Sequence, residues 1–179
     1  IACGVIIGAI WLVEKVVDHF ESDKPTTNSK PYTSDPPNTR LQYTKPRNAP
    51  NGRPWPTKAA YVSGYTQLNQ DGLSKVTIDN SQNNADVFVK LVSIDGEQAY
   101  PTRQFFIPAY GRFILEEVSA GNYDIRYRDL ETGHLSRSES FQLKEVETYD
   151  GVEYSNYKIT LYKIRNGNMK TYDLSESDF

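Results

Sequence analysis

Apolar and polar residues alternate along most of the chain from about residue 61 onward, and the clearest example is the stretch 120–128. It opens with Ala120–Gly121–Asn122, which is turn chemistry, because Gly and Asn tolerate backbone conformations that most residues avoid. The following alternation has a period of two, which predicts a half-buried antiparallel strand. We expect one set of side chains in the core, with Tyr123 as an anchor, and the other on a solvated face. The core set is Tyr123, Ile125 and Tyr127, and the solvated set is Asp124, Arg126 and Arg128.

The same pattern recurs in short segments that are separated by turn residues. Asn166–Gly167 is a strong hairpin signal and predicts that residues 157–164 pair with residues 168–172. Residues 144–154, rich in Glu, Tyr and Asp, are expected to form a longer loop. About eight strands at this spacing predict an all-β domain over residues 61–179, an antiparallel β-sandwich. The other expected strands lie near residues 75–79, 87–94, 105–107, 113–116 and 140–144.

The chain begins with an apolar segment. Residues 1–13 carry no charge, and apolar residues continue up to Phe20. As a helix, residues 1–13 would reach roughly 20 Å, short of the roughly 30 Å hydrocarbon core of a bilayer. We interpret residues 1–20 as the C-terminal part of a membrane-anchoring helix, truncated at its start, with a cleaved secretory leader as the alternative. Gly4 and Gly8 form a Gly-x-x-x-Gly pair, which in lipid lets two helices pack closely and self-associate.

Residues 21–60 are predicted to be a flexible linker. Eight of the ten prolines of the chain lie between residues 25 and 56, and Ser, Thr, Asn and Lys make up much of the remainder. Such a stretch buries too little apolar surface to fold by itself, and proline keeps it extended. Trp55 is expected to pack onto the edge of the domain that follows.

Charge is distributed unevenly along the chain. Residues 14–60 hold eight Lys and Arg against five Asp and Glu, whereas residues 61–179 hold twelve against eighteen. The predicted β-domain over residues 61–179, called the head below, is therefore acidic. An acidic head argues against a nucleic-acid partner, whose phosphates require cationic contacts. We place the head outside the cytoplasm, in a periplasm or at a cell surface. The orientation in the membrane stays open, because Lys15, Lys24 and Lys30 favour a cytoplasmic head by the positive-inside rule.

Catalytic motifs are matched by spacing alone. Ser155 and Lys158 fit Ser-x-x-Lys, and Tyr154 with Lys158 fits Tyr-x-x-x-Lys, but both motifs need a helix to bring the side chains together. Here the residues fall on an expected strand. His134 has no second His or Cys near it in the sequence, and Cys3 is the single cysteine. We therefore expect no metal, no cofactor and no enzymatic activity, with a hydrolase of unrecognised site as an alternative.

Tyrosine is frequent, with thirteen residues in the chain. Exposed tyrosines beside acidic residues suit the recognition of a protein or a glycan. We expect partner binding around residues 144–154, through Tyr149, Asp150 and Tyr154, with Tyr110 as a further contact.

Residues 119–125, Ser-Ala-Gly-Asn-Tyr-Asp-Ile, resemble the small–Gly–x–Tyr–x–aliphatic turn and strand of prealbumin-like domains. That group includes the carboxypeptidase-regulatory-like and collagen-adhesin B-type sandwiches. Residues 113–115 and 129–133 resemble the neighbouring strand and turn, so the likeness covers residues 85–145. It implies a prealbumin-like sandwich, akin to the immunoglobulin type, in which Tyr123 enters the core. It implies a stalk or binding module and identifies no ligand.

These patterns predict a membrane-anchored, non-enzymatic binding or assembly module that presents a β-sandwich on a flexible stalk, as a subunit of a cell-envelope complex. Its partners would be the membrane, through residues 1–20, and another protein or a glycan. A secreted glycan-binding domain with an N-terminal leader remains the alternative.

Overall fold

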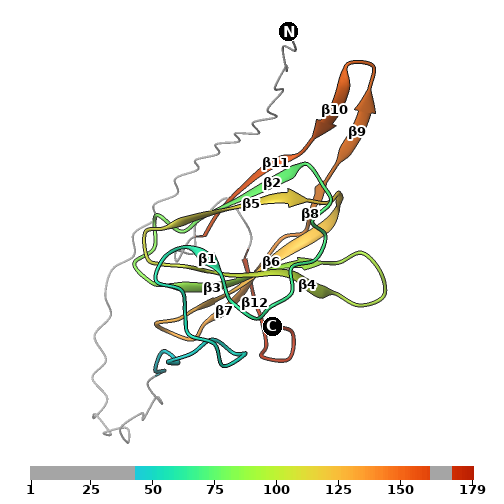
Figure 1. The fold of residues 1–179 in the computed structure, drawn as a ribbon. Coiled ribbons are helices and arrows are strands. Elements are labelled where there is room, and N and C mark those ends of the chain that lie inside the picture. Colours follow the sequence, from blue (N-terminus) through green and yellow to red (C-terminus); the bar gives the residue numbers. More distant parts are fainter. Residues whose placement is uncertain (1–42, 162–170) are drawn as a thin grey trace, which may run out of the picture. The chain divides into compact units, whose positions relative to one another are not determined.

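The computed structural model describes residues 43–161 and 171–179 (Figure 1). Within these ranges the chain forms strands and turns without a helix, which confirms the predicted all-β class for them. They therefore include no helix able to cross a membrane, and the predicted anchor with Gly4 and Gly8 lies outside them. The strands are β1 (Ala60–Tyr61), β2 (Ser74–Asp79), β3 (Val87–Ser93), β4 (Tyr100–Ile107), β5 (Arg112–Val118), β6 (Gly121–Asp129), β7 (Leu135–Ser138), β8 (Phe141–Leu143), β9 (Glu145–Thr148), β10 (Gly151–Tyr154), β11 (Asn156–Thr160) and β12 (Thr171–Asp173).

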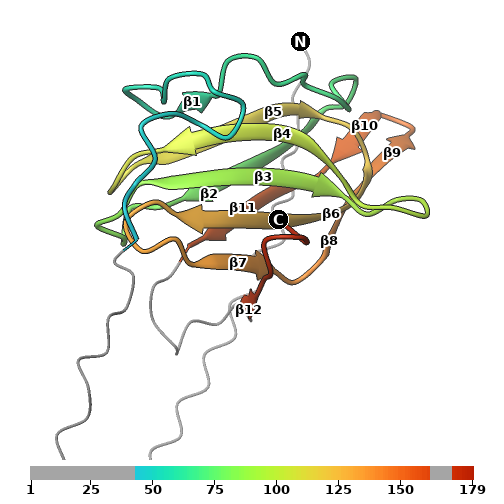
Figure 2. The same ribbon diagram turned by 90° about the horizontal axis from the view of Figure 1, so that it is seen from below.

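The strands form two sheets and a separate two-stranded ribbon. The large sheet has the order β1-β4-β3-β6-β7-β12, with β8 also paired to β6, and the small sheet has the order β11-β2-β5. Figure 1 shows the two sheets as two layers, an arrangement consistent with a β-sandwich, and Figure 2 looks onto the large sheet. The described pairs are antiparallel except for β11 with β2, which run parallel. The ribbon consists of β9 and β10.

The core lies between the two layers. Tyr123 and Ile125 of β6 are 0% exposed and Tyr127 is 7% exposed, which confirms the predicted inward set. Opposite them, Val76 and Ile78 of β2 are fully buried. The two inner faces contribute to one continuous hydrophobic cluster. Apolar burial of this kind is the main favourable term in folding.

Tyr123 is fixed at the polar end of its buried side chain. Its hydroxyl donates to the main-chain oxygen of Ser119 at 2.9 Å and accepts from Asn69 Nδ2 at 3.0 Å. The main-chain N–H of Ser119 in turn donates to the carbonyl of Asn69 at 3.1 Å. The ring therefore fills the core while its hydroxyl ties two loops together, and the predicted anchor is confirmed.

Gly121 is required by a close approach at the start of β6. A Cβ atom at this position would lie 2.5 Å from Asp95 Oδ2. The same carboxylate accepts from the main-chain N–H of Asn122 at 2.8 Å and from its side-chain amide at 2.7 Å. The predicted turn chemistry thus serves a junction with the loop after β3.

The outer face of the large sheet carries a second apolar cluster. Phe88 is 0% exposed and Phe106 is 4% exposed, and Trp55 lies against both, with ring centroids at 5.5 and 5.8 Å. Residues 43–60, which the sequence assigns to the linker, lie with the following strands in one compact unit, and Ala49 is 3% exposed. Strands β3 and β4 are therefore buried on both faces, which explains the near-continuous apolar run of β3.

Burial on the outer face corrects one expectation. Asp124, Arg126 and Arg128 point away from the core as predicted, but their face is not solvated. Their side chains are 4%, 14% and 17% exposed. The alternation gave the correct faces, but it carries no information on segments that cover a sheet from elsewhere in the chain.

Two local predictions near the end of the chain are wrong. Strand β12 does not pair with β11 across Asn166–Gly167, because it pairs with β7 in the large sheet while β11 pairs with β2 in the small sheet. Residues 145–154, expected to lie in a loop, form the β9–β10 ribbon.

Candidate functional site

The β9–β10 ribbon projects away from the body of the molecule (Figure 1). Its register pairs Val146 with Glu153 and Glu147 with Val152. The connecting turn places Tyr149 and Asp150 at the tip, where the two sequence-predicted contacts lie side by side in the chain. The ribbon is a two-stranded sheet with no third strand among the described residues.

The root of the ribbon is held firmly. Glu145 Oε1 accepts from the main-chain N–H groups of Leu73 at 2.7 Å and Ser74 at 3.3 Å. On the other strand, the main-chain N–H of Ser155 donates to the carbonyl of Lys144 at 3.1 Å, and Ser155 Oγ accepts from the N–H of Lys144 at 2.8 Å. These bonds fix the direction in which the ribbon leaves the body.

Beyond its root the ribbon is exposed along its whole length. Val146 and Val152 are 52% and 44% exposed, Tyr154 is 45% exposed, and Tyr149 at the tip is fully exposed. Each valine lies opposite a glutamate, so neither face of the ribbon is continuously apolar. A ribbon of this composition is not built to fold back onto its own core, and an isolated two-stranded hairpin is only marginally stable in water.

The ribbon is also strongly acidic. Residues 145–154 contain four carboxylates, at positions 145, 147, 150 and 153, and no Lys or Arg. Glu145 is bound at the root, which leaves the other three carboxylates on exposed positions around the tip. Acidic groups mixed with exposed Tyr and Val suit a contact with a basic partner.

Tyr110 lies away from the ribbon. It is 66% exposed and belongs to the turn before β5, at the end of that strand where Arg112 pairs with Asp79. The ribbon is rooted beside Ser74, which pairs with Val118 at the other end of β5. The structure therefore places Tyr149 and Asp150 at the tip of the ribbon and Tyr154 at its root, opposite Glu145, and leaves Tyr110 apart from the ribbon.

The residues that match catalytic spacings serve different contacts. Ser155 bonds to Lys144 at the root of the ribbon, whereas Lys158 Nζ lies 3.0 Å from Asp79 Oδ2 on the small sheet. His134 is exposed in the turn after β6, and its Nε2 lies 3.3 Å from Asp173 Oδ1. The Ser-x-x-Lys pair is thus divided between two structural roles.

Asp79 is a buried carboxylate with a structural role. Its side chain is 5% exposed and is paired with Arg112 at 3.1 Å and with Lys158. Burial alone would raise the pKa of the Asp79 carboxyl, but hydrogen bonds from Ser81, Lys158 and Arg112 outweigh it and hold this pKa well below its usual range. The ionised group fastens the end of β2 to its two neighbouring strands.

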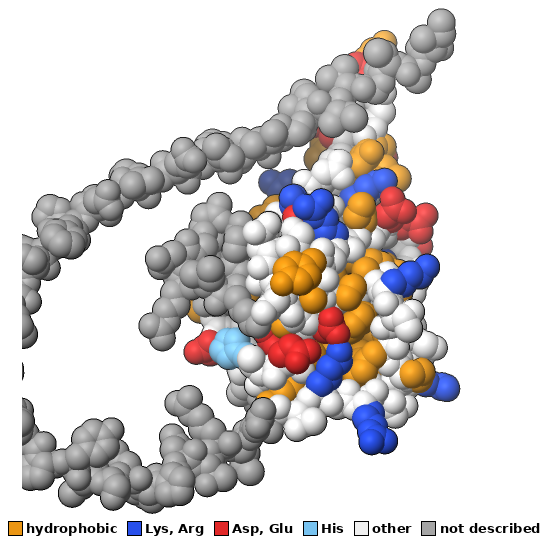
Figure 3. Space-filling view, turned by 90° about the vertical axis from the view of Figure 1, so that its left-hand side faces the viewer, with side chains coloured by type: hydrophobic (Ala, Val, Ile, Leu, Met, Phe, Trp, Pro, Cys, Tyr) orange, Lys and Arg blue, Asp and Glu red, His pale blue; other side chains and the backbone are white. Residues whose placement is uncertain are grey.

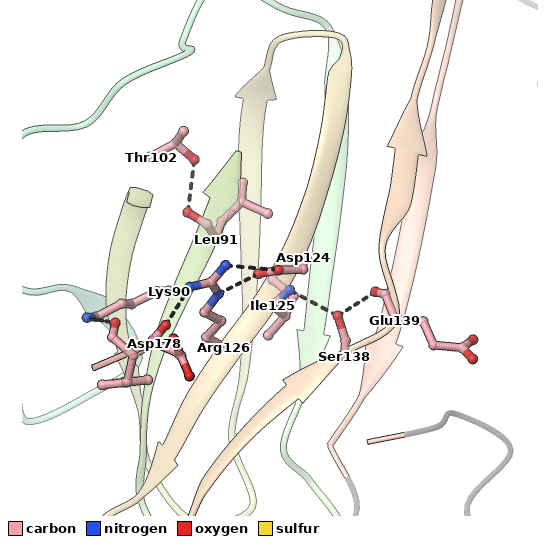
Figure 4. Close-up of polar contacts among 10 residues, drawn as sticks. Lys90, Leu91, Thr102, Asp124, Ile125, Arg126, Ser138, Glu139 and Asp178 are labelled. Atoms are coloured by element: carbon pink, nitrogen blue, oxygen red, sulfur yellow. Dashed lines mark hydrogen bonds and ion pairs between the residues drawn. The ribbon is translucent and has the colours of Figure 1, made fainter. Parts of the chain in front are cut away.

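A cluster of polar side chains lies on the outer face of β3 and β6 (Figure 4). Asp124 and Arg126 form a two-pronged ion pair, with contacts of 3.0 and 3.3 Å. Burial, together with the charges of Arg128 and Arg126, lowers the pKa of the Lys90 ammonium to about 8, against the opposing effect of Glu176. Beside the cluster is an open hollow of about 610 Å³, lined by residues that include Arg126, Arg137, Glu139 and Tyr172.

Sequence reasoning missed this cluster and the two ribbon valines. A signal existed for the valines, because Glu-Val-Glu-Thr and Gly-Val-Glu-Tyr flank Tyr149–Asp150 with strand-like alternation. For the cluster, the sequence shows charged residues at outward positions of a strand. No nearby sequence pattern indicates that other segments of the chain bury these charged side chains.

The side of the body seen in Figure 3 carries acidic, basic and apolar side chains interspersed. Its basic groups lie apart from one another and do not form a continuous stripe of the kind that tracks a phosphate backbone. Among residues 43–161 and 171–179, no three His, Cys, Asp or Glu side chains are grouped to hold a metal ion.

Comparisons of the chain with protein-family models, curated proteins and solved structures found no match.

Proposed function

We propose that the chain is a non-enzymatic binding or assembly module, anchored to a membrane through residues 1–20, that presents a β-sandwich to a partner as a subunit of an envelope complex. The observation that carries the proposal is the β9–β10 ribbon, which is fixed at its root and exposed over the rest of its length. Exposed aromatic and aliphatic residues on a projecting element cost free energy in the isolated protein and favour contact with a partner.

The partner that best fits the ribbon is a protein with an exposed edge strand flanked by Lys or Arg. A two-stranded ribbon offers hydrogen-bonding edges, and addition of a strand to such an edge is a common mode of recognition. The carboxylates around the tip complement basic flanking residues. They also disfavour pairing with the ribbon of a second copy, since that would place like charges opposite one another.

The anchor and the polar segment would set location and reach. With residues 43–60 packed against the large sheet, the remaining tether is residues 21–42. At about 3 Å per residue in an extended form, it spans up to roughly 70 Å. Tethering of this kind raises the effective concentration of the head near a partner on the same membrane.

We further propose that the sandwich is prealbumin-like. The buried Tyr123, whose hydroxyl contacts Asn69 and Ser119, supports this assignment, because the family motif also places its tyrosine in the core after a tight turn. An experimental structure with strand connections unlike those of prealbumin would contradict it.

The proposal is tested by capturing partners with the intact chain, solubilised from its own membrane in a mild detergent. The wild-type chain is compared with a ribbon variant that combines Tyr149→Ser and Val152→Ser. A partner retained by the wild type should be lost, or bound at least tenfold more weakly, by the ribbon variant. It should also dissociate as salt rises from 50 to 500 mM, a range over which exposed charges become screened.

Tyr110→Ser is the matched control, because it removes an exposed tyrosine from the other end of the small sheet. Equal loss of the partner by this control and by the ribbon variant would contradict the ribbon as the contact surface. For the anchor, mass spectrometry of the mature N-terminus decides: cleavage near residue 13 would contradict membrane anchoring through residues 1–20.

A further inference from the structure

Three cationic side chains lie together on the outer face of the large sheet. In the pairing of β3 with β6, Lys90 lies opposite Arg126, and Phe88 lies opposite Arg128. Like charges directly opposite each other destabilise a pair of strands. The arginine side chains are 14% and 17% exposed, so water screens this repulsion only partly. Such a cluster is stable only where acceptors lie against it.

Those acceptors come largely from one short part of the chain, the tail segment (residues 174–179). Arg126 Nη1 donates to the main-chain oxygen of Asp178 at 2.5 Å (Figure 4). Lys90 Nζ donates to the main-chain oxygen of Phe179. Arg128 Nη2 lies 2.5 Å from Glu176 Oε2. Each of the three cations therefore contacts the tail segment, while Asp124 supplies a further carboxylate from β6 itself.

The ring of Phe179 lies against two of the cations. Lys90 Nζ lies 4.1 Å from its centroid and Arg128 Cζ lies 5.0 Å from it. The ring also meets Phe88 edge to face at 5.9 Å. Cation–π contacts of this geometry favour an aromatic ring over an aliphatic side chain of similar size. The cluster thus recognises an aromatic group as well as negative charge.

The tail segment is less deeply buried than the other cover of this sheet. In residues 43–68, Ala49 and Val62 are 3% and 1% exposed. In the tail segment, Glu176 keeps 73% of its side chain exposed. Its fold is also local, because Ser175 accepts from the main-chain N–H of Phe179 at 3.1 Å and donates from its hydroxyl to the Asp178 carboxylate at 2.5 Å. The tail segment can therefore leave without disturbing the core between the two sheets, and its departure uncovers Phe88 in the second apolar cluster.

We propose that Phe88, Lys90, Arg126 and Arg128 form a docking site for an acidic peptide segment that carries a phenylalanine three residues after a glutamate. The tail segment occupies this site in cis. A partner protein that presents the same chemistry displaces it. The site lies on the large sheet and is separate from the ribbon, so it does not depend on the function proposed above.

The test uses a full chain that ends at Asp173 and a fluorescent peptide with the sequence of residues 174–179. Anisotropy should report binding to the shortened chain. The intact chain should bind the peptide at least tenfold more weakly, because its own tail segment competes at an effective concentration on the order of millimolar. A peptide carrying Phe179→Ala should lose at least tenfold in affinity.

Site specificity is checked with a pair of arginines in the shortened chain. Arg128→Ala should weaken binding at least fivefold. Arg112→Ala, on the small sheet and 62% exposed, should leave the affinity unchanged. The full chain with Phe179→Ala is a second receptor that keeps every main-chain contact of the tail segment, and it should bind the peptide more tightly than the wild type. If the shortened chain does not fold, the affinity of the full chain with Phe179→Ala for the peptide tests the proposal instead.

Folded receptors that bind the peptide no better than a scrambled sequence would overturn the proposal. So would equal weakening by Arg128→Ala and Arg112→Ala. A concentration-dependent dimer of the intact chain that disappears when residues 174–179 are removed would assign the site to the tail segment of a second copy, and would overturn the partner peptide.

Discussion

The outer face of the large sheet and the β9–β10 ribbon each combine aromatic, aliphatic and charged side chains. On the outer face Phe88 is 0% exposed, and the arginines beside it are bonded to neighbours. On the ribbon Tyr149 is fully exposed, and both valines keep close to half of their surface in water. The outer face is covered by residues 43–68 and 174–179 of the same chain.

This difference in exposure predicts that the outer face contributes to stability and that the ribbon contributes to binding. A mixed surface that its own chain covers behaves as a second core, so changes there should lower the free energy of unfolding. A mixed surface left uncovered adds little to stability, and its apolar residues are accessible to a partner. The predictions that follow set a covered residue beside an exposed one wherever the chain offers a pair.

The largest contrast is between two tyrosines. Tyr123→Ala should lower the free energy of unfolding by about 3–5 kcal/mol, because it leaves an aromatic-sized cavity in the core. Tyr149→Ala should change it by less than about 0.5 kcal/mol, as expected for an exposed position. Urea denaturation followed by circular dichroism measures both. A small effect of Tyr123→Ala would mean that the faces of β6 are inverted.

The second contrast concerns the outer face itself. Phe88→Ala should destabilise the protein by about 3 kcal/mol, because its ring packs against Trp55, Tyr65 and Phe179. Val152→Ala on the ribbon is the aliphatic control and should be nearly neutral. If thermal unfolding finds Phe88→Ala neutral as well, residues 43–68 do not cover the sheet in solution.

A pair of carboxylates gives a smaller contrast. Asp79→Asn should cost about 2 kcal/mol at neutral pH, because charge-assisted hydrogen bonds to Ser81, Lys158 and Arg112 are weakened. The pKa of Asp79 is depressed in the folded state, so its contribution is fully present above its unfolded value of 3.8 and fades as the pH falls below it. The two proteins should therefore converge in stability in acid. Glu147→Gln, at an exposed position on the ribbon, is the control and should change the free energy of unfolding by less than about 0.5 kcal/mol at neutral pH.

The smallest expected effect is a change in how steeply the free energy of unfolding rises with pH. The pKa of Lys90 is lowered from 10.5 to about 8 in the folded state, so the unfolded chain binds more protons between these values. Stability from this group should rise with pH across that range. Lys90→Met should show a shallower rise between pH 7.5 and 9.5 in urea titrations, with the exposed Lys58→Met as the lysine control. Parallel curves for wild type and Lys90→Met would show that Lys90 is not desolvated beside Arg126 and Arg128.

The sequence predicted the inner face well, because a period of two together with turn residues determines which side chains meet the core. Tyr123, Ile125 and Val76 all lie where the alternation places them. It could not predict what covers the outer face, since that cover comes from segments far away in the chain. Arg103 is a further example: it is 1% exposed at an inward position and donates to the carbonyl of Asn69, a contact that no local pattern indicates.

The contact role of Tyr149, Asp150 and Tyr154 stays a prediction, whereas the structure shows the secondary structure of the segment that carries them. Composition points to these three residues, and the structure places them on one ribbon, whereas the sequence pattern around them predicts a loop. The Asn166–Gly167 hairpin failed for a different reason. A turn signal indicates where a chain reverses, and it does not determine which sheet the next strand joins.

The most direct test of the central claim is site-specific photo-crosslinking in the cells that make this protein. A photoreactive amino acid is placed at position 149 or at position 110 of the intact chain, each in place of an exposed tyrosine. The account predicts a discrete crosslinked adduct from position 149 that disappears when Val152→Ser is added, and no adduct from position 110. The absence of an adduct at position 149, together with a discrete adduct at position 110, would contradict it.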